Sequence, residues 1–166
     1  PKKRYYQGQK FADEVEILAQ ERAKKLFNVV HVNVQPYSGS PANTAVYFAL
    51  LKPLEDKIMG LALSSGGHLT HGSPVSFSGK YFKTVSFTVT KDGVLDYDAI
   101  ELLTKREKPQ IIVCGFTAYP RTIDFKRFSE IADKVNAYLL ADISHIAGLI
   151  VGGSHPSPAP YAHILM

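Results

Sequence analysis

Cysteine is almost absent from this sequence: Cys114 is the only one in 166 residues, and there is no tryptophan. One cysteine excludes an internal disulfide bond and suits a reducing compartment, so we expect a cytoplasmic protein. Cys114 lies in the apolar run QIIVCGF (110–116), where a buried and inert thiol is a better interpretation than a nucleophile.

Long apolar runs and concentrated charge are also lacking. No run reaches the ~18 apolar residues that a membrane-spanning helix needs. The formal net charge is +4, and the lysines are scattered along the chain. We therefore expect neither a membrane nor a nucleic-acid partner, although an anionic ligand would fit.

The two ends of the sequence indicate a piece of a longer protein. The chain begins at PKKRYY without a methionine and stops at Met166 inside the apolar run AHILM. A natural terminus usually lies in a surface segment. The length and the apolar fraction of 45% suit one domain with a real core. We therefore expect residues 1–166 to form a single, partial domain.

Helical and strand-like periods alternate along the chain. Predicted N-terminal caps are Ser40, followed by Pro41 at the first helical position, and then Asp96 and Asp124. Pro109 is expected to prevent the third helix from continuing. Residues 11–27 carry Phe11, Val15, Leu18, Arg22 and Leu26 at helical spacing and are predicted to form a helix. Further helices are predicted at 95–108 and 122–136, and another is predicted to begin within 38–51. The predicted strands are 31–34, 57–63, 81–89, 110–116, 137–143 and the run 162–166.

Apolar strands alternating with amphipathic helices predict an α/β fold with three layers, α/β/α, around a mostly parallel sheet. In such folds, ligands collect beyond the carboxyl ends of the strands. The loops expected to meet at that edge carry Ser38-Gly39-Ser40, Gly66-Gly67-His68, Thr117-Ala118-Tyr119, and Asp142 with His145.

Each of these polar groups has a plain interpretation and a functional one. Ser38-Gly39-Ser40 before a helix is either a capping turn or a cradle for a phosphate. Asp142 at the end of an apolar strand is either an N-cap for SHIAGL or a carboxylate that pairs with a protonated ring nitrogen.

His68 and His71, three residues apart, allow three interpretations. A zinc site is the poorest, since no cysteine or acid lies near them in the sequence. His68, which follows two glycines, could lie over an aromatic cofactor ring, and His71 is interpreted as a structural, hydrogen-bonding histidine. Together with the cradle, the Thr117 hydroxyl and Asp142, a stacking His68 describes a pocket for pyridoxal phosphate.

Five segments carry a resemblance to a known family: RYYQGQKFADEVEILAQERAKKLF, NVQPYSGSPANTAVYFALL, GGHLTHGSPVSFSGK, AYPRTIDFKRFSEIADKVNAYLLADISHIAGLI and HPSPAPYAH. In these the sequence resembles serine hydroxymethyltransferase over essentially all 166 residues. The resemblance implies part of the large domain of a fold-type-I, pyridoxal-phosphate-dependent transferase that acts as a homodimer or a tetramer. The implied reaction interconverts serine plus tetrahydrofolate with glycine plus 5,10-methylenetetrahydrofolate.

The resemblance also implies roles for individual residues. Ser38, Gly39 and Ser40 would hold the cofactor phosphate, and Thr117, at a position that is usually serine, would bond the phenolic oxygen of the cofactor. The implied catalytic residues are His68 stacked on the ring, Asp142 on the ring nitrogen, His145 near the phenolic oxygen, and Tyr6; the implied substrate and folate contacts are Tyr5, Tyr6, Leu63, Gly67 and Leu69, and no metal is implied.

The same resemblance places an N-terminal arm, the lysine that binds the cofactor covalently and a C-terminal domain outside these 166 residues. No lysine follows Asp142 in the sequence. We therefore expect the parent protein to be active and this chain alone to be inactive. The alternatives are a different fold-type-I enzyme, such as an aminotransferase or an aldolase, and a non-catalytic module that binds pyridoxal phosphate weakly or self-associates.

Overall fold

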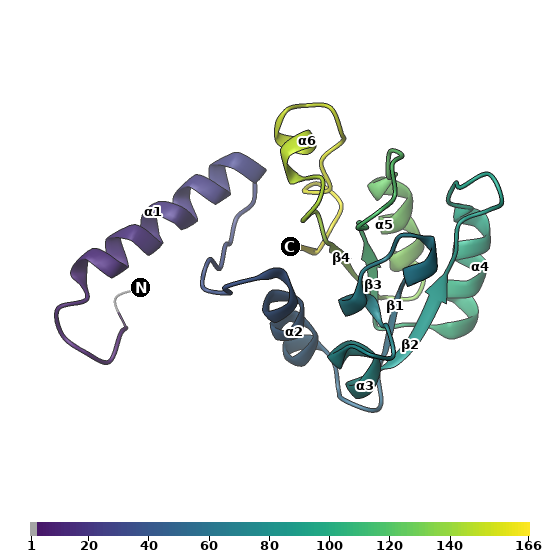
Figure 1. Ribbon diagram of the computed structural model, residues 1–166, viewed down its shortest axis with the longest axis horizontal. Helices are drawn as coiled ribbons and strands as arrows, with labels where there is room; N and C mark the ends of the chain where they lie inside the picture. Colours follow the sequence, from purple (N-terminus) through teal and green to yellow (C-terminus); the bar gives the residue numbers. More distant parts are fainter. Residues whose placement is uncertain (1–2) are drawn as a thin grey trace. The chain divides into compact units, whose positions relative to one another are not determined.

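The computed structural model describes residues 3–166, which form two compact units. The first unit ends at Ser38 and contains α1 (Lys10–Phe27). The second unit runs from Gly39 to Met166 and contains a five-stranded sheet (Figure 1). Its strands are β1 (Lys57–Leu61), β2 (Lys83–Phe87), β3 (Ile111–Cys114), β4 (Tyr138–Ala141) and β5 (Ile164–Leu165).

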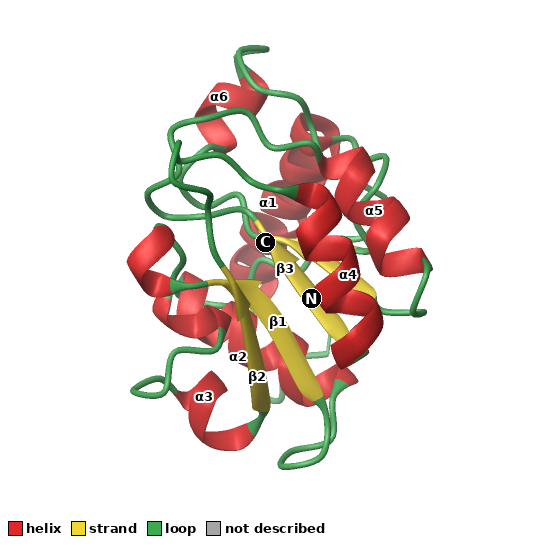
Figure 2. Cartoon of the chain, turned by 90° about the vertical axis from the view of Figure 1, so that its right-hand side faces the viewer, coloured by secondary structure: helices red, strands yellow, loops and turns green. Residues whose placement is uncertain are grey.

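The five strands follow the order β2-β1-β3-β4-β5, and every pairing between them is parallel. Parallel neighbours need crossover connections, and helices in the intervening segments supply them (Figure 2). The helices of this unit are α2 (Gly39–Leu50), α3 (Phe77–Tyr81), α4 (Tyr97–Glu107), α5 (Phe125–Asp133) and α6 (Ala147–Val151), with two short 3-10 helices, η1 (Leu63–Ser65) and η2 (Leu69–His71).

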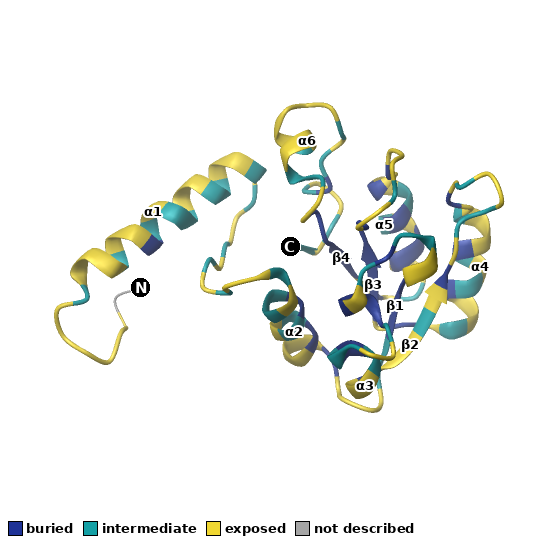
Figure 3. Cartoon of the chain, viewed as in Figure 1, coloured by how far each residue is buried: buried dark blue, intermediate teal, exposed yellow. Residues whose placement is uncertain are grey.

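Helices cover both faces of the sheet. On one face, Tyr47 of α2 packs in a buried cluster with Ile58 of β1 and Ile111 of β3. On the other face, the fully buried ring of Phe128 on α5 contacts Phe87 and Phe116. The central strands are buried on both sides, as the dark segments of Figure 3 show. The predicted α/β/α fold with a mostly parallel sheet is therefore confirmed.

Two of the three predicted helix caps are confirmed. The Asp96 carboxylate accepts hydrogen bonds from two backbone N–H groups at the start of α4, and Asp124 accepts one at the start of α5. The cap at Ser40 is wrong, because α2 begins at Gly39 and so includes Ser40. Proline is tolerated anywhere in the first turn, where backbone N–H groups have no partner within the helix. Pro41 therefore did not locate the first residue of the helix.

The first unit confirms one predicted element and corrects another. Helix α1 forms as expected, and it is the longest described helix, at 18 residues. Residues 31–34 are irregular and do not form the predicted strand. A strand needs a partner, and in the described part of this unit no strand lies beside them. Within residues 3–166, no helix is both long enough and apolar enough to cross a membrane.

The packing of α5 predicts a large effect of one core substitution. We expect Phe128→Ala to lower the free energy of unfolding by about 3–5 kcal/mol, because it removes a fully buried ring and leaves a cavity. Leu102→Ala is the matched control, since Leu102 on α4 is 69% exposed, and it should change stability by less than about 0.5 kcal/mol. Urea unfolding followed by circular dichroism measures both, and equal effects would contradict the described core.

Candidate functional site

The carboxylate of Asp142, directly after β4, is the centre of a buried polar cluster. Its Oδ2 accepts hydrogen bonds from Asn43 Nδ2 on α2 at 3.1 Å and from His71 Nε2 on η2 at 2.9 Å. Its Oδ1 accepts from the Ser144 backbone N–H at 3.2 Å and from the Ser144 hydroxyl at 2.6 Å. Three segments that are distant in sequence thus meet on one carboxylate.

These contacts keep Asp142 ionised. The residue is only 7% exposed, and burial alone would raise the pKa of its carboxyl group. The hydrogen bonds from His71 and Ser144 outweigh burial and lower the pKa of Asp142 from 3.8 to about 2. An ionised carboxylate only accepts hydrogen bonds, so Nε2 of His71 carries its hydrogen. The site therefore holds a buried negative charge at neutral pH.

The structure tests one of the two interpretations of Asp142, the N-cap. Helix α6 begins at Ala147 after Ile146, and no side chain caps it. The N-cap interpretation of Asp142 is therefore wrong. His71 makes the buried hydrogen bond predicted for a structural histidine, and its partner is Asp142.

His68 is joined to the same cluster through Thr70. Its Nδ1 accepts from the Thr70 backbone N–H at 3.2 Å and lies 2.8 Å from the Thr70 hydroxyl, which in turn accepts from Asn43 Nδ2 at 2.9 Å. The rings of His68 and His71 are 5.4 Å apart. Partial burial and the neighbouring His71 lower the pKa of His68, so its ring is neutral at neutral pH.

Two glycines allow the loops at this edge to approach one another. Gly115 follows β3 with φ +101°, and a Cβ there would lie 1.9 Å from the carbonyl oxygen of Asp142. Gly67 follows β1, and a Cβ there would lie 1.9 Å from the carbonyl oxygen of Leu61. A side chain at either position would push the chain away from the site.

The loop after β3 is tied to the loop after β1. The backbone N–H groups of Thr117 and Ala118 both donate to the carbonyl oxygen of Gly66, at 2.9 and 3.0 Å. Thr117 is exposed at this edge, and so are Leu63 and Leu69, at 53% and 43%. The predicted convergence of the loops after β1, β3 and β4 is therefore observed.

Of the three residues predicted to cradle a phosphate, Gly39 and Ser40 begin the second unit. Gly39 begins α2, and a Cβ at Gly39 would lie 3.8 Å from the Ser144 hydroxyl oxygen, next to the Asp142 cluster. Ser40 follows it and is exposed, and so is His145 at the other side of Ser144. Ser38 is the last residue of the first unit and is also exposed. The start of α2 therefore lies beside the Asp142 cluster.

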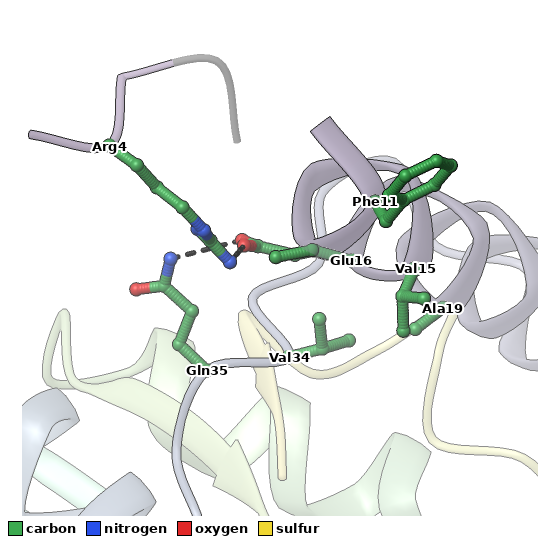
Figure 4. Close-up of a pocket in the computed structure, with 8 residues that line it drawn as sticks. Arg4, Phe11, Val15, Glu16, Ala19, Val34 and Gln35 are labelled. Carbon is green, nitrogen blue, oxygen red and sulfur yellow. Dashed lines mark hydrogen bonds and ion pairs between the residues drawn. The ribbon is translucent and has the colours of Figure 1, made fainter. Parts of the chain in front are cut away.

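Tyr5 and Tyr6 belong to the first unit, where they are 96% and 77% exposed. Arg4 anchors their segment to α1 through ion pairs with Glu16 at 2.7 Å and Asp13 at 3.4 Å. Figure 4 shows Arg4 and Gln35 converging on Glu16, beside a pocket lined by apolar side chains: Phe11, Ala12, Val15, Ala19 and Val34. This unit thus presents two aromatic rings on an anchored segment.

Three residues of the cluster were not predicted: Asn43, Thr70 and Ser144. Asn43 and Thr70 lie two residues after Pro41 and His68, and Ser144 lies two residues after Asp142. Their proximity to predicted residues was the only signal in the sequence. No group of three His, Cys, Asp or Glu side chains that could hold a metal ion occurs among residues 3–166.

The lowered pKa of Asp142 predicts a pH dependence of stability. A depressed carboxyl pKa stabilises the folded protein above the unfolded value near 4, and this contribution is lost as pH falls towards 2. We expect the wild type to lose about 2 kcal/mol more than Asp142→Asn across that range. Urea unfolding between pH 5 and pH 2.5 measures the difference, and parallel curves would contradict an ionised, bonded Asp142.

Comparison with known proteins gives consistent results over the whole chain. A family model described as serine hydroxymethyltransferase matches residues 1–166. The chain is 58% identical over 165 residues to a probable serine hydroxymethyltransferase of Mesomycoplasma hyopneumoniae (strain J), covering 99% of this chain and 39% of that relative. It is 58% identical to the serine hydroxymethyltransferase of Campylobacter jejuni (strain NCTC 11168), covering 99% of this chain and 40% of that relative.

A third relative, the serine hydroxymethyltransferase of Desulfotalea psychrophila, is 56% identical over 165 residues, with 99% of this chain and 39% of the relative covered. The chain therefore spans about two fifths of the length of the curated relatives it matches. Because the family model matches every residue, the chain belongs to the serine hydroxymethyltransferase family.

Proposed function

We propose that this chain forms the cofactor-binding part of a pyridoxal-phosphate-dependent enzyme that interconverts serine plus tetrahydrofolate with glycine plus 5,10-methylenetetrahydrofolate. The observation that carries the proposal is the buried, ionised carboxylate of Asp142 at the carboxyl edge of a parallel sheet. Membership of the family supports the same reaction.

The residues at this edge fit pyridoxal phosphate, which combines a phosphate with a pyridine ring. Asp142 offers a permanent negative charge to a protonated ring nitrogen, and the Asn43 and His71 bonds prevent its carboxylate from turning. The partly exposed, neutral ring of His68 offers a flat surface for stacking. The start of α2, with Ser38, Gly39 and Ser40, offers backbone N–H groups and hydroxyls to the phosphate.

When bound, the cofactor supplies an electron sink for carbanion chemistry on the amino acid. Asp142 keeps a proton on the ring nitrogen, because its own pKa of about 2 prevents it from taking that proton at neutral pH. Thr117 would orient the phenolic oxygen of the bound cofactor with its hydroxyl, and His145 would lie near that oxygen. His68 excludes water from one face of the ring.

Serine, glycine and tetrahydrofolate are the substrates we propose. Leu63 and Leu69 offer exposed apolar side chains to the flat pteridine of the folate. They flank the closely packed Gly67 in the sequence. Tyr5 and Tyr6 contact substrate and folate in the site of a neighbouring subunit. Their exposure, with that of Phe11 at 73% and Val15 at 67%, supports a homodimer or a tetramer.

We propose that the complete enzyme works in the cytoplasm and that this chain alone does not turn over serine. No lysine follows Asp142 within these residues, and the family resemblance places the covalent lysine after this point. The isolated chain should therefore bind pyridoxal phosphate weakly and reversibly. Activity is therefore to be tested in the proposed complete enzyme.

Asp142→Asn tests the proposed function directly. We expect the variant to fold and to lose serine turnover by orders of magnitude, because an amide of the same shape cannot keep the ring nitrogen protonated. The measurement is kcat for serine cleavage with tetrahydrofolate, after cofactor content has been matched to that of the wild type. Activity close to that of the wild type would remove Asp142 from this role and the proposed function with it.

His68→Ala tests the stacking role. Loss of the stacked ring should weaken binding of pyridoxal phosphate about tenfold and shift the absorption of the bound cofactor. His155→Ala is the control, because His155 accepts from the Ile123 N–H and contacts Phe125, and it has no role in the proposed cofactor site. Unchanged affinity and spectrum in His68→Ala would contradict stacking, and loss of a stoichiometric metal would support a metal site instead.

A further inference from the structure

The Asp142 carboxylate has no unused acceptor position. A carboxylate offers about four lone-pair positions, two on each oxygen. Oδ2 accepts one hydrogen bond from Asn43 and one from His71. Oδ1 accepts one from the backbone N–H of Ser144 and one from its hydroxyl. A further donor can bond to this carboxylate only by displacing one of the four.

Three of the four donors are held in place. Asn43 is 1% exposed, and its amide also binds the Thr70 hydroxyl. His71 is 3% exposed, and its backbone lies against Gly60, where a Cβ would be 2.9 Å from the His71 carbonyl oxygen. The Ser144 N–H belongs to the backbone of the turn after β4. None of these three groups can leave Asp142 without moving the chain or opening the core.

The Ser144 hydroxyl is different, because one torsion about its Cα–Cβ bond is enough to move it. Ser144 is an exposed residue, so its hydroxyl can exchange Asp142 for water. It also has a second, weak acceptor in the Met166 sulfur at 3.8 Å. Its bond to Asp142 is nevertheless short, at 2.6 Å, as expected of a hydroxyl that donates to a charged oxygen.

We propose that the Ser144 hydroxyl is an exchangeable donor, which occupies Oδ1 of Asp142 and gives way when the ring N–H of the cofactor bonds there. The inference rests on the role proposed for Asp142 and adds a positioning residue to it. While bonded, the hydroxyl holds the carboxylate in one orientation and satisfies its charge. It also competes with the cofactor, so the protein binds the ring less tightly than an unopposed carboxylate would.

Ser144→Ala separates this exchange from simple support. If the hydroxyl competes, its removal should tighten binding of pyridoxal phosphate by about tenfold, since a hydrogen bond to a charged group contributes roughly 1.5 kcal/mol or more. The dissociation constant is measured by spectral titration of the cofactor-free, full-length protein. Unchanged or weaker binding would overturn the proposal, because a hydroxyl that supports Asp142 in the complex predicts weaker binding.

Two matched variants make the result specific. Ser144→Thr keeps a hydroxyl at the same position and should bind the cofactor with nearly the affinity of the wild type. Ser129→Ala removes a hydroxyl on α5 that donates to the Tyr161 carbonyl oxygen and makes no hydrogen bond to Asp142, so it should have no effect. Tighter binding in Ser144→Thr, or in Ser129→Ala, would overturn the exchange.

A readout without cofactor tests the hydrogen bond itself. The carboxyl carbon of Asp142, followed by carbon NMR in the cofactor-free protein, should titrate at higher pH in Ser144→Ala, since one of the bonds that lower its pKa is gone. Combining Ser144→Ala with Asp142→Asn should abolish the gain in affinity. If the unaltered protein binds no cofactor, the proposed function fails; if it binds cofactor but Ser144→Ala does not bind more tightly, the exchange alone fails.

Discussion

A single buried charge, the carboxylate of Asp142, constrains how the segments at one edge of the sheet are arranged in the second unit. Placing an unpaired carboxylate in a protein interior costs several kcal/mol or more, so the fold must supply donors for it. Donors come from α2, from η2 and from the turn after β4. The start of α2 and the loop after β1 are therefore held beside the end of β4. If either segment were displaced, the carboxylate would lose hydrogen-bond donors.

The backbone around the Asp142 carboxylate is closely packed. Gly115 and Gly67 sit where any side chain would collide with a carbonyl oxygen of the neighbouring segment. The loops after β1 and β3 are joined through the Gly66 carbonyl, which accepts two backbone hydrogen bonds. The buried part of the site thus consists of closely packed backbone and buried polar side chains. The groups that would contact a ligand are exposed: Thr117, Ser144 and His145.

The first unit is held together by a separate set of polar contacts. Arg4, Asp13, Glu16 and Gln35 form a polar cluster that holds the segment before α1 and the segment leading to Ser38 onto the same helix. Phe11, Val15 and Leu18 on α1 remain exposed. A helix that keeps an apolar stripe in water while its polar groups are well paired is consistent with a surface that another chain covers in the proposed assembly.

The sequence by itself was sufficient to predict the sheet, the capping residues Asp96 and Asp124, and the edge at which polar loops meet. These features could be predicted because hydrophobic periodicity and local capping act over a few residues. It failed at residues 31–34, where strand formation depends on a neighbour, and at Ser40, where a proline is compatible with several starting points. Only the tertiary structure decided that Asp142 caps no helix, that His71 is its partner, and that Asn43 and Ser144 complete its hydrogen bonds. These contacts join residues up to 99 positions apart, and no local pattern encodes a distance between two side chains that only packing brings together.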